Sequence, residues 1–230
     1  MVTRADLKRS AKASLRGKWG ISVVCTLIVT VIIAVIQMLG MMPGMVQAIA
    51  GAGDPEEVYL ALYTSPWYFI STIVVFLIAV GLGIGLTKLF LRISRNSDAS
   101  VGTVFEGFKI YGRAFVMMLL EAIFIYLWSL LLVIPGIVAS YRYRMASYIL
   151  LDDDSVSGLD AIRQSKEMMR GHKGELFIMD LSFIGWMILA AIPCGLGYFW
   201  LSPYMEVSYA NFYRNLKGEF SASSDAAVGA

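Results

Sequence analysis

Five charged side chains lie inside long apolar stretches of the sequence, and they are the residues best suited to carry chemistry. These residues are Glu121, Arg142, Arg144, Asp180 and Glu206. A charged group is costly in lipid, so such residues usually face the interior of a helix bundle, pair there, or line a path through it. Two interpretations stay open: salt bridges that hold helices together, and a polar pathway for an ion, a proton or an amphiphile.

Residues that could support catalysis or hold a metal are few and scattered. His172 is the only histidine, and Cys25 and Cys194 lie far apart within apolar segments. Neither a zinc or copper site nor a disulfide framework can be built from them. The triplet at residues 152–154, Asp-Asp-Asp, lacks the glycine and the distal glutamate of a calcium-binding loop, so we interpret it as a solvated helix cap. We therefore expect no metal, no cofactor and no enzymatic activity.

The composition indicates a chain whose surface faces lipid as well as water. Of its residues 58% are hydrophobic and 16% are charged, and the mean hydropathy is +0.68. These values depart from soluble proteins in the direction of membrane proteins. The net charge of +2 is too small to indicate a nucleic-acid partner.

Six apolar segments predict the elements that position the charges. They cover residues 20–42, 67–91, 114–134, 137–151, 174–192 and 196–213. About 20 helical residues cross a hydrocarbon core of about 30 Å, so the fourth segment is short. Pro135 and Gly136 predict one hairpin turn, and Pro193 and Gly195 another. We expect an all-α integral membrane protein with six transmembrane helices in three hairpins and amphipathic interfacial helices.

The distribution of basic residues predicts the orientation. With six spans, 17 of the 19 Lys and Arg residues fall on one side, leaving Arg142 and Arg144 inside the fourth segment. An excess of Lys and Arg marks the cytoplasmic side of a membrane protein. We therefore expect a multi-pass protein whose two termini are both cytoplasmic.

Two segments predict basic amphipathic helices on that side, over residues 3–18 and 158–170, and the apolar stripe of residues 101–111 predicts a third, shorter amphipathic helix. Ser157 and Asp160 form a capping pair before the second helix. We expect the cations of both basic helices to contact anionic lipid headgroups or a membrane or cytoplasmic protein partner. These cations are Arg9, Lys12, Arg16, Arg163, Lys166 and Arg170.

Gly81 and Gly85 have the spacing that lets two helices approach closely. The partner helix could belong to the same chain, which we favour, or to a second copy in a homodimer.

The chain also resembles a threefold repeat. Residues 143–148 and 204–209 both read Y-x-x-x-S-Y, and Arg9, Lys12 and Arg16 match Arg163, Lys166 and Arg170 at one constant offset. We therefore divide one membrane domain into residues 1–98, 99–156 and 157–217, each an amphipathic helix followed by a hairpin. Residues 218–230 are small and polar, and we expect a disordered tail.

Several segments together resemble a bacterial family, the domain of unknown function 975. They read LKRSAKASLRGKWG, EGFKIYGRAF, LWSLLLVIPGIVASYRYRMASYIL, SKEMMRGHKGELFIMDLSFIGW and WLSPYMEVSYANFYRNL. The turn IPG has a looser likeness to the membrane domains of some glycerophosphodiesterases. The resemblance implies a bacterial cytoplasmic-membrane protein and supplies no catalytic residues. We expect a non-enzymatic scaffold or accessory to envelope or export processes, with a transporter or permeation pathway as the alternative.

Overall fold

The computed structural model describes residues 2–51, 54, 56, 59–60 and 63–220. The chain is all-helical, with 83% helix and no strand in the described residues. In chain order the elements are α1 (Arg4–Leu15), α2 (Trp19–Gly51), α4 (Pro66–Ser94), α5 (Val101–Phe105), the 3-10 helix η1 (Glu106–Ile110), α6 (Tyr111–Leu131), α7 (Val133–Tyr143), α8 (Ala146–Asp152), α9 (Gly158–Met168), α10 (Lys173–Ala191) and α11 (Tyr198–Leu216).

Four of the described helical stretches are long and apolar enough to cross a membrane. They are Trp19–Val46, Pro66–Ser94, Val101–Leu131 and Lys173–Ala191. The fourth predicted span is divided between α7 and α8, and the sixth, α11, buries much of its surface inside the protein. The six crossings in three hairpins stay a prediction, while the all-helical class and the apolar helices are observed.

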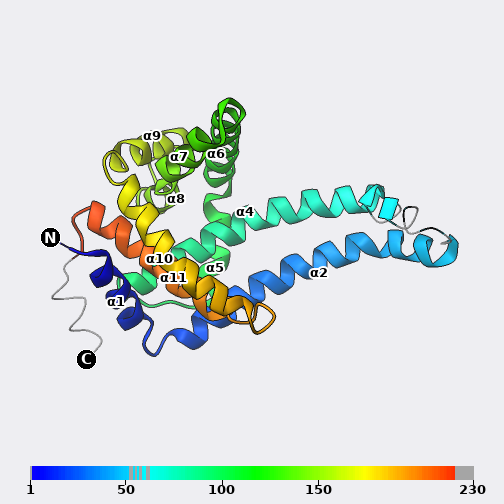
Figure 1. The fold of residues 1–230 in the computed structure, drawn as a ribbon, viewed down its shortest axis with the longest axis horizontal. Helices are drawn as coiled ribbons and strands as arrows, with labels where there is room; N and C mark the ends of the chain where they lie inside the picture. Colours follow the sequence, from blue (N-terminus) through cyan, green and yellow to red (C-terminus); the bar gives the residue numbers. More distant parts are fainter. Residues whose placement is uncertain (1, 52–53, 55, 57–58, 61–62, 221–230) are drawn as a thin grey trace.

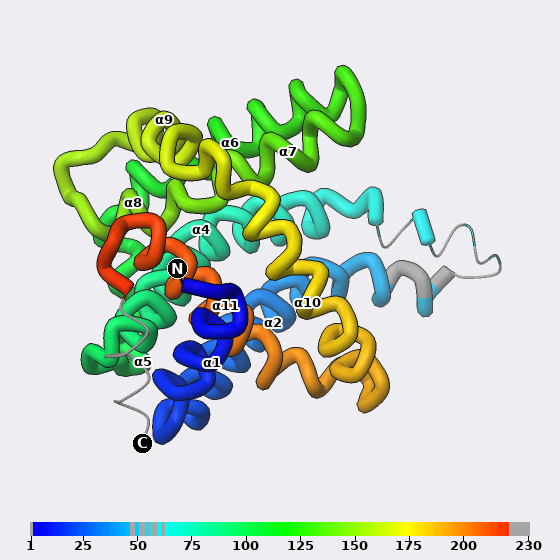
Figure 2. The backbone as a smooth tube through the Cα atoms, turned by 60° about the vertical axis from the view of Figure 1, so that its left-hand side comes forward, coloured from blue at the N-terminus to red at the C-terminus, as the bar shows by residue number. Residues whose placement is uncertain are grey.

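The long helices lie in three pairs that project from one assembly of shorter helices. Figures 1 and 2 show α2 beside α4, α6 beside α7 and α10 beside α11, and each pair is in contact. In Figure 2 the far ends of the pairs point to one side of the molecule, and α1, α5, α8 and α9 lie towards the other. Figure 1 shows that the α6–α7 pair points upwards while the α2–α4 pair points to the right, so the pairs splay apart and do not run parallel.

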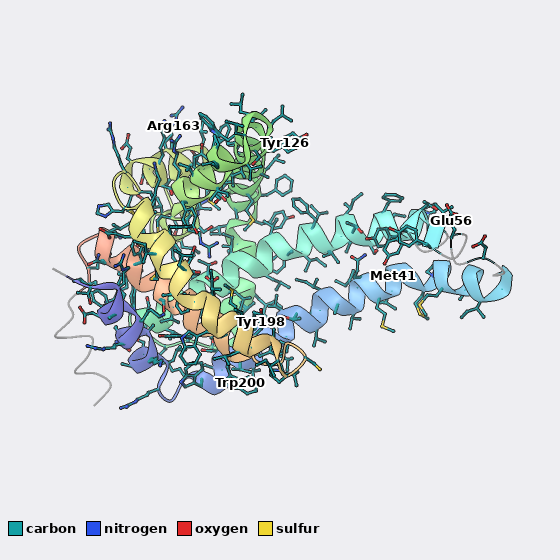
Figure 3. The ribbon with its side chains drawn as sticks, in the orientation of Figure 1. Met41, Glu56, Tyr126, Arg163, Tyr198 and Trp200 are labelled. Carbon is teal, nitrogen blue, oxygen red and sulfur yellow. The ribbon has the colours of Figure 1, made fainter. Side chains whose placement is uncertain are left out.

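The outward surfaces of these pairs are apolar. The turn between α6 and α7 is an extreme case, because Leu130, Val133 and Ile134 are 71–74% exposed. Figure 3 shows side chains along α2 and α4 pointing away from the protein, with Met41 labelled on α2. A water-soluble protein rarely leaves so large a contiguous apolar surface uncovered.

Helix α11 forms the centre of the packed region. It contacts α1, α2, α4 and α10, and Val207, Ala210 and Phe212 are almost fully buried. The side-chain amide of Asn211 is also buried and donates to the backbone oxygen of Leu7 at 3.1 Å. The second half of α11 therefore has little surface left for lipid, whereas Tyr198 and Trp200 near its start are 42% and 56% exposed.

The first helix begins as its sequence predicts. Thr3 and Asp6 form a capping box at its start, and Gly17 adopts φ +73° after its end. Its apolar stripe, Leu7, Ala11 and Leu15, is buried in contact with α11 and α4. The stripe thus stabilises the fold, and only the basic face of α1 is directed outwards.

The two predicted hairpin turns differ in detail. The chain breaks at Leu132, which is extended at φ −162° and ψ 151°, and Pro135 and Gly136 lie within the first turns of α7. A proline is tolerated there because the first turn has no helical acceptor for its missing N–H. In the second turn Cys194 and Gly195 adopt φ of +51° and +82°, which places the reversal where the sequence predicts it.

A hydroxyl group explains why the predicted helix 137–151 is broken. Ser165 of α9 is buried, accepts a hydrogen bond from the Met145 backbone N–H at 3.1 Å and donates one to the Arg142 carbonyl at 3.0 Å. It replaces helical bonds at the junction between α7 and α8. Similarly, α2 does not end before Pro43 but continues through it to Gly51.

The two glycines of the close-packing motif face the same chain. An added Cβ at Gly85 would overlap the Val104 backbone at 1.7 Å, and one at Gly81 would meet the Phe108 ring at 2.5 Å. On the facing helix η1, an added Cβ at Gly107 would meet the Gly81 carbonyl at 2.1 Å. The motif therefore seats α5 and η1 against α4.

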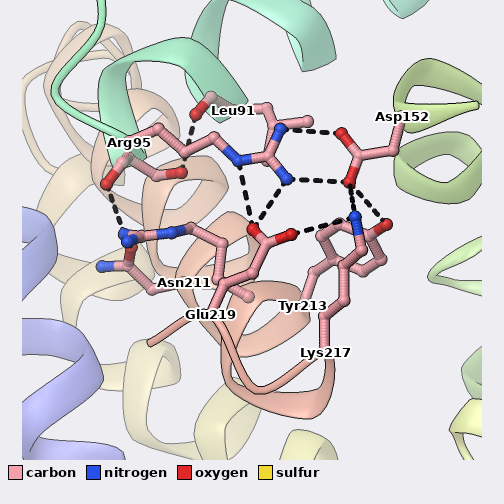
Figure 4. A network of polar contacts seen from close by, with 9 residues as sticks. Leu91, Arg95, Asp152, Asn211, Tyr213, Lys217 and Glu219 are labelled. Carbon is pink, nitrogen blue, oxygen red and sulfur yellow. Dashed lines mark hydrogen bonds and ion pairs between the residues drawn. The ribbon is translucent and has the colours of Figure 1, made fainter. Parts of the chain in front are cut away.

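A network of charged side chains joins the ends of α4, α8 and α11 (Figure 4). Arg95 donates two hydrogen bonds to Asp152, both 2.7 Å, and also pairs with Glu219 at 2.8 Å. Lys217 and Tyr213 donate to Asp152 at 2.8 and 2.9 Å. Burial raises the pKa of Asp152, but these three donors outweigh it and hold the pKa at about 2.

Two sequence expectations change here. Asp152 is not part of a solvated cap, because its side chain is only 10% exposed. Glu219 and Phe220 fall in the segment predicted to be disordered, yet Glu219 is ion-paired and Phe220 is buried, with the Arg214 guanidinium 5.6 Å from its ring centre. The rest of that segment, 221–230, lies outside the described residues.

Candidate functional site: a polar cavity between two helix pairs

Four of the five predicted intramembrane charges come together around one cavity and its wall. The cavity has a volume of about 440 Å³ and is open to the outside. Its lining contains Glu121 from α6, Asp180 from α10 and Arg144 at the end of α7. Glu206 from α11 pairs with Arg144 at 3.7 Å. Residues far apart in the sequence thus build a single polar site.

Asp180 is held by two tyrosine hydroxyl groups. Tyr141 of α7 donates to its Oδ2 at 2.7 Å, and Tyr209 of α11 donates to its Oδ1 at 2.8 Å. Both carboxylate oxygens therefore have a donor, and the two hydrogen bonds fix the carboxylate between α7 and α11. Neither donor is charged, so the formal negative charge of Asp180 is not neutralised by them.

Arg144 lies beside the acidic groups, but they do not occupy all of its hydrogen-bond donors. Its guanidinium lies 4.7 Å from the Tyr209 ring centre, within the range of a cation–π contact. Its separation from Glu206 exceeds hydrogen-bond distance, and 47% of the side chain is exposed. Tyr148 also interacts electrostatically with both Arg144 and Glu206. Arg144 can therefore still offer donors to a group in the cavity.

Of the four charged residues, Glu121 has the fewest interactions with other side chains. Among the described residues its carboxylate experiences the charge of Arg144 but makes no hydrogen bond or ion pair. The site consequently holds three carboxylates and one guanidinium. Such an arrangement can accept a cationic group between the carboxylates and, beside it, an anionic group on Arg144.

Arg142, the fifth predicted member, lies elsewhere. It lines a different pocket, with residues of α9, and its guanidinium is 5.8 Å from the Trp128 ring centre. The reason is helix geometry, because positions 142 and 144 are about 200° apart around α7 and cannot share a face.

The cavity also contains residues that sequence reasoning missed. Ser140, Tyr141 and Ser147 line it, and Tyr209 stands behind Asp180. Ser140, Arg144 and Ser147 follow a spacing of four and three along the chain, which is the signal that could have placed them on one side of α7 and α8. For Tyr209, the contact with Asp180 depends on how α10 folds onto α11, and no local pattern indicates it.

The remaining predicted residues take several positions. The basic side chains Arg9, Lys12, Arg16, Arg163, Lys166 and Arg170 are exposed, and Figure 3 labels Arg163 at the outer surface of α9. Lys12 also lies over two aromatic rings, Trp186 and Tyr204, at 5.7 and 5.4 Å. Within the described part of the chain, no three His, Cys, Asp or Glu side chains are grouped to hold a metal ion.

The fold and the cavity together define a class: an all-helical protein whose long apolar helices are compatible with a membrane. The family model described as "Protein of unknown function (DUF975)" matches residues 1–136 and 129–219. The chain belongs to this family. No curated protein and no solved structure matches it.

Proposed function

We propose that this chain is a non-enzymatic integral membrane protein that binds a small solute or amphiphile through a positively charged group in the polar cavity. The observation that carries the proposal is the convergence of Glu121 and Asp180 on one open cavity whose lining contains a single guanidinium, Arg144, which already lies beside a third carboxylate, Glu206. Salt bridges that only joined helices would be expected to pair each carboxylate with a cation.

The charge balance favours a cation as the ligand. Two unit charges roughly 4–8 Å apart interact by about 2–4 kcal/mol at an effective dielectric constant of ~20. With three carboxylates and one guanidinium, an ammonium-like group gains attraction from the acids and relieves their mutual repulsion. An anion would find only Arg144, which is already beside Glu206.

The surroundings of the cavity favour an amphiphile over a fully hydrated ion. Ile125 and Ile137 line the cavity together with the polar groups. The neighbouring outward residues Ile123 and Val138 are 43% and 40% exposed. In a membrane these surfaces would border lipid, so a molecule with a charged head and an apolar body could reach the cavity sideways.

The proposed setting is a cytoplasmic membrane of a bacterium, crossed six times, with both termini cytoplasmic. The placement of 17 of the 19 basic residues on one side supports it. The far ends of the three helix pairs also lie towards one side of the molecule in Figure 2, which supports it as well, although the pairs splay apart. In this setting the cavity opens within the membrane, and passage of the bound molecule through it would make the protein a transporter.

A scaffold that recruits a cytoplasmic partner is the second candidate. Its specific support is the outward direction of the basic side chains on α1 and α9, with Arg9 and Arg163 82% and 69% exposed. The docked apolar stripe of α1 gives it less support than the sequence alone, because that stripe is already covered by the protein.

Binding of a lipophilic cation tests the first candidate. The full chain in lipid nanodiscs would be titrated with radiolabelled tetraphenylphosphonium and with tetraphenylborate, which has the same shape and the opposite charge. We expect the cation to bind more tightly, and Glu121→Gln with Asp180→Asn to weaken it about 10-fold, near 1.4 kcal/mol.

Asp98→Asn with Asp154→Asn is the matched control, since both residues are exposed and lie outside the cavity. Aqueous thiol labelling of Glu121→Cys, in a background with Cys25→Ala and Cys194→Ala, tests hydration. Met117→Cys, fully buried one helical turn earlier, should stay protected. Equal affinity for the two probes would count against a ligand site and favour a structural role. The same conclusion would follow if Glu121→Gln alone unfolded the protein.

A further inference from the structure

A second cavity lies beside α7 and is lined almost wholly by cations. Its volume is about 480 Å³, and its lining residues are Arg142, Arg163, Lys166, Glu167, Arg170 and Lys173. We propose that this basic pocket binds the phosphate group of an anionic lipid headgroup. The site is separate from the polar cavity, so a result that contradicts one of the two proposals does not affect the other.

The fold, not only the composition, brings these cations together. Arg163, Lys166 and Arg170 lie three and four positions apart, so they share the exposed face of α9 and the turn after it. The opposite face of α9 is buried, and its Ser165 bonds the Arg142 carbonyl at 3.0 Å. That bond places the α7 cation next to the α9 row.

A turn closes the pocket from the other end. Gly171 adopts φ +88°, a conformation that other residues rarely take, and allows α10 to start at Lys173 directly after α9. Lys173 therefore joins Arg170 at the rim. Cations from α7, α9 and α10 surround the same space, which a row of charges on one solvated helix would not achieve.

The pocket carries charge that the protein does not neutralise. Five basic side chains face one acidic lining residue, Glu167, a formal excess of four positive charges. Among the described residues, the only ion pair made by any of the five is Arg163 with Asp160 at 3.4 Å. A phosphate group supplies the missing charge and can accept several of the Arg and Lys donors at once.

The surroundings assign the phosphate to a lipid. The guanidinium of Arg142 lies over Trp128, and Phe177 sits one helical turn beyond Lys173 and is 46% exposed. Trp128 belongs to the apolar stretch of α6, so the cations of this pocket border apolar side chains of α6 and α10. Acyl chains attached to the bound phosphate would lie against this apolar surface, and basic pockets between membrane helices bind lipid headgroups of this kind.

The test is equilibrium binding of a short-chain lipid to the full chain in a non-ionic detergent. The probes are dioctanoyl phosphatidylglycerol, dioctanoyl phosphatidylcholine and inorganic phosphate. We expect the glycerol lipid to bind at least 10-fold more tightly than the other two. The double variant Arg142→Gln with Lys166→Gln should weaken its binding about 10-fold, and Glu167→Gln should strengthen it about threefold.

The control removes the same charge from exposed sites outside the pocket, in Arg4→Gln with Lys109→Gln. Its affinity should stay within twofold of the unmodified chain. Equal weakening by the two double variants would overturn the proposal, because it would reduce the effect to overall charge. Inorganic phosphate binding as tightly as the lipid would overturn the assignment to a lipid and identify a site for soluble phosphate.

Discussion

The substitution Asp152→Asn should destabilise the protein substantially, although the residue lies in a run of three aspartates. Its carboxylate accepts from Arg95, Tyr213 and Lys217 and is 10% exposed. The pKa of about 2, against an ordinary value of 3.8, corresponds to about 2 kcal/mol of folding free energy at neutral pH. For a protein of this size that is a fall in Tm of about 4–8 °C.

The sign of the pH dependence follows from the lowered pKa. A carboxyl group whose pKa is lower in the folded state stabilises fully above its unfolded pKa and loses that contribution as pH falls through the folded pKa. The Asp152 contribution should therefore be complete above about pH 5, and about 1 kcal/mol of it should be lost by pH 3. In Asp152→Asn this part of the acid sensitivity should be absent.

The assay is thermal unfolding in detergent at pH 7 and pH 3, followed by intrinsic fluorescence. Asp154→Asn is the matched control, because Asp154 also pairs with an arginine, Arg113, at 2.7 Å but is 93% exposed. Exposed pairs contribute little, so its Tm should change by no more than about 1 °C. If the two variants behaved alike, the reasoning from burial and convergent donors would be refuted.

Two further pairs of substitutions test the packing. Gly85→Ala places a Cβ on the Val104 backbone and should lower the free energy of unfolding by about 2–4 kcal/mol. Gly83→Ala has no atom within 4 Å of the added Cβ and should raise the free energy of unfolding by about 0.5–1 kcal/mol in the same thermal assay. The reverse order would show that α5 does not pack there. Ser165→Ala leaves the Met145 N–H without its acceptor and should cost about 1–3 kcal/mol, measured beside Ser155→Ala, an exposed serine outside the helices.

Much of the fold could be predicted from local patterns, because apolar length and helix caps are local properties. The capping pair Ser157 and Asp160 begins α9 as expected, with Ser157 accepting from the Asp160 N–H at 3.2 Å. The break between α7 and α8 could not be predicted, since the group that causes it, Ser165, is on another helix. The threefold repeat stays a prediction, although Gly17 and Gly171 share a positive φ.

The candidate site could likewise be predicted only in part. Depth in the apolar segments was enough to select Glu121, Arg144, Asp180 and Glu206, which the structure brings together. Depth alone also selected Arg142, which points to the other side of α7. Applying the helical rotation between positions 142 and 144 would have separated them, but the position of Arg142 beside the cations of α9 depends on the contact with Ser165.

The apolar turn between α6 and α7 has a consequence for how the protein is made. In the sequence, the segment between α2 and α4 carries Asp54, Glu56 and Glu57. In the proposed orientation this charged connection crosses the membrane, at a hydration cost. The connections after α6 and after α10 contain no charged residue. In the proposed orientation these two pairs could enter the bilayer from the cytoplasm with no hydrophilic segment to translocate, and only the first pair would require the export machinery.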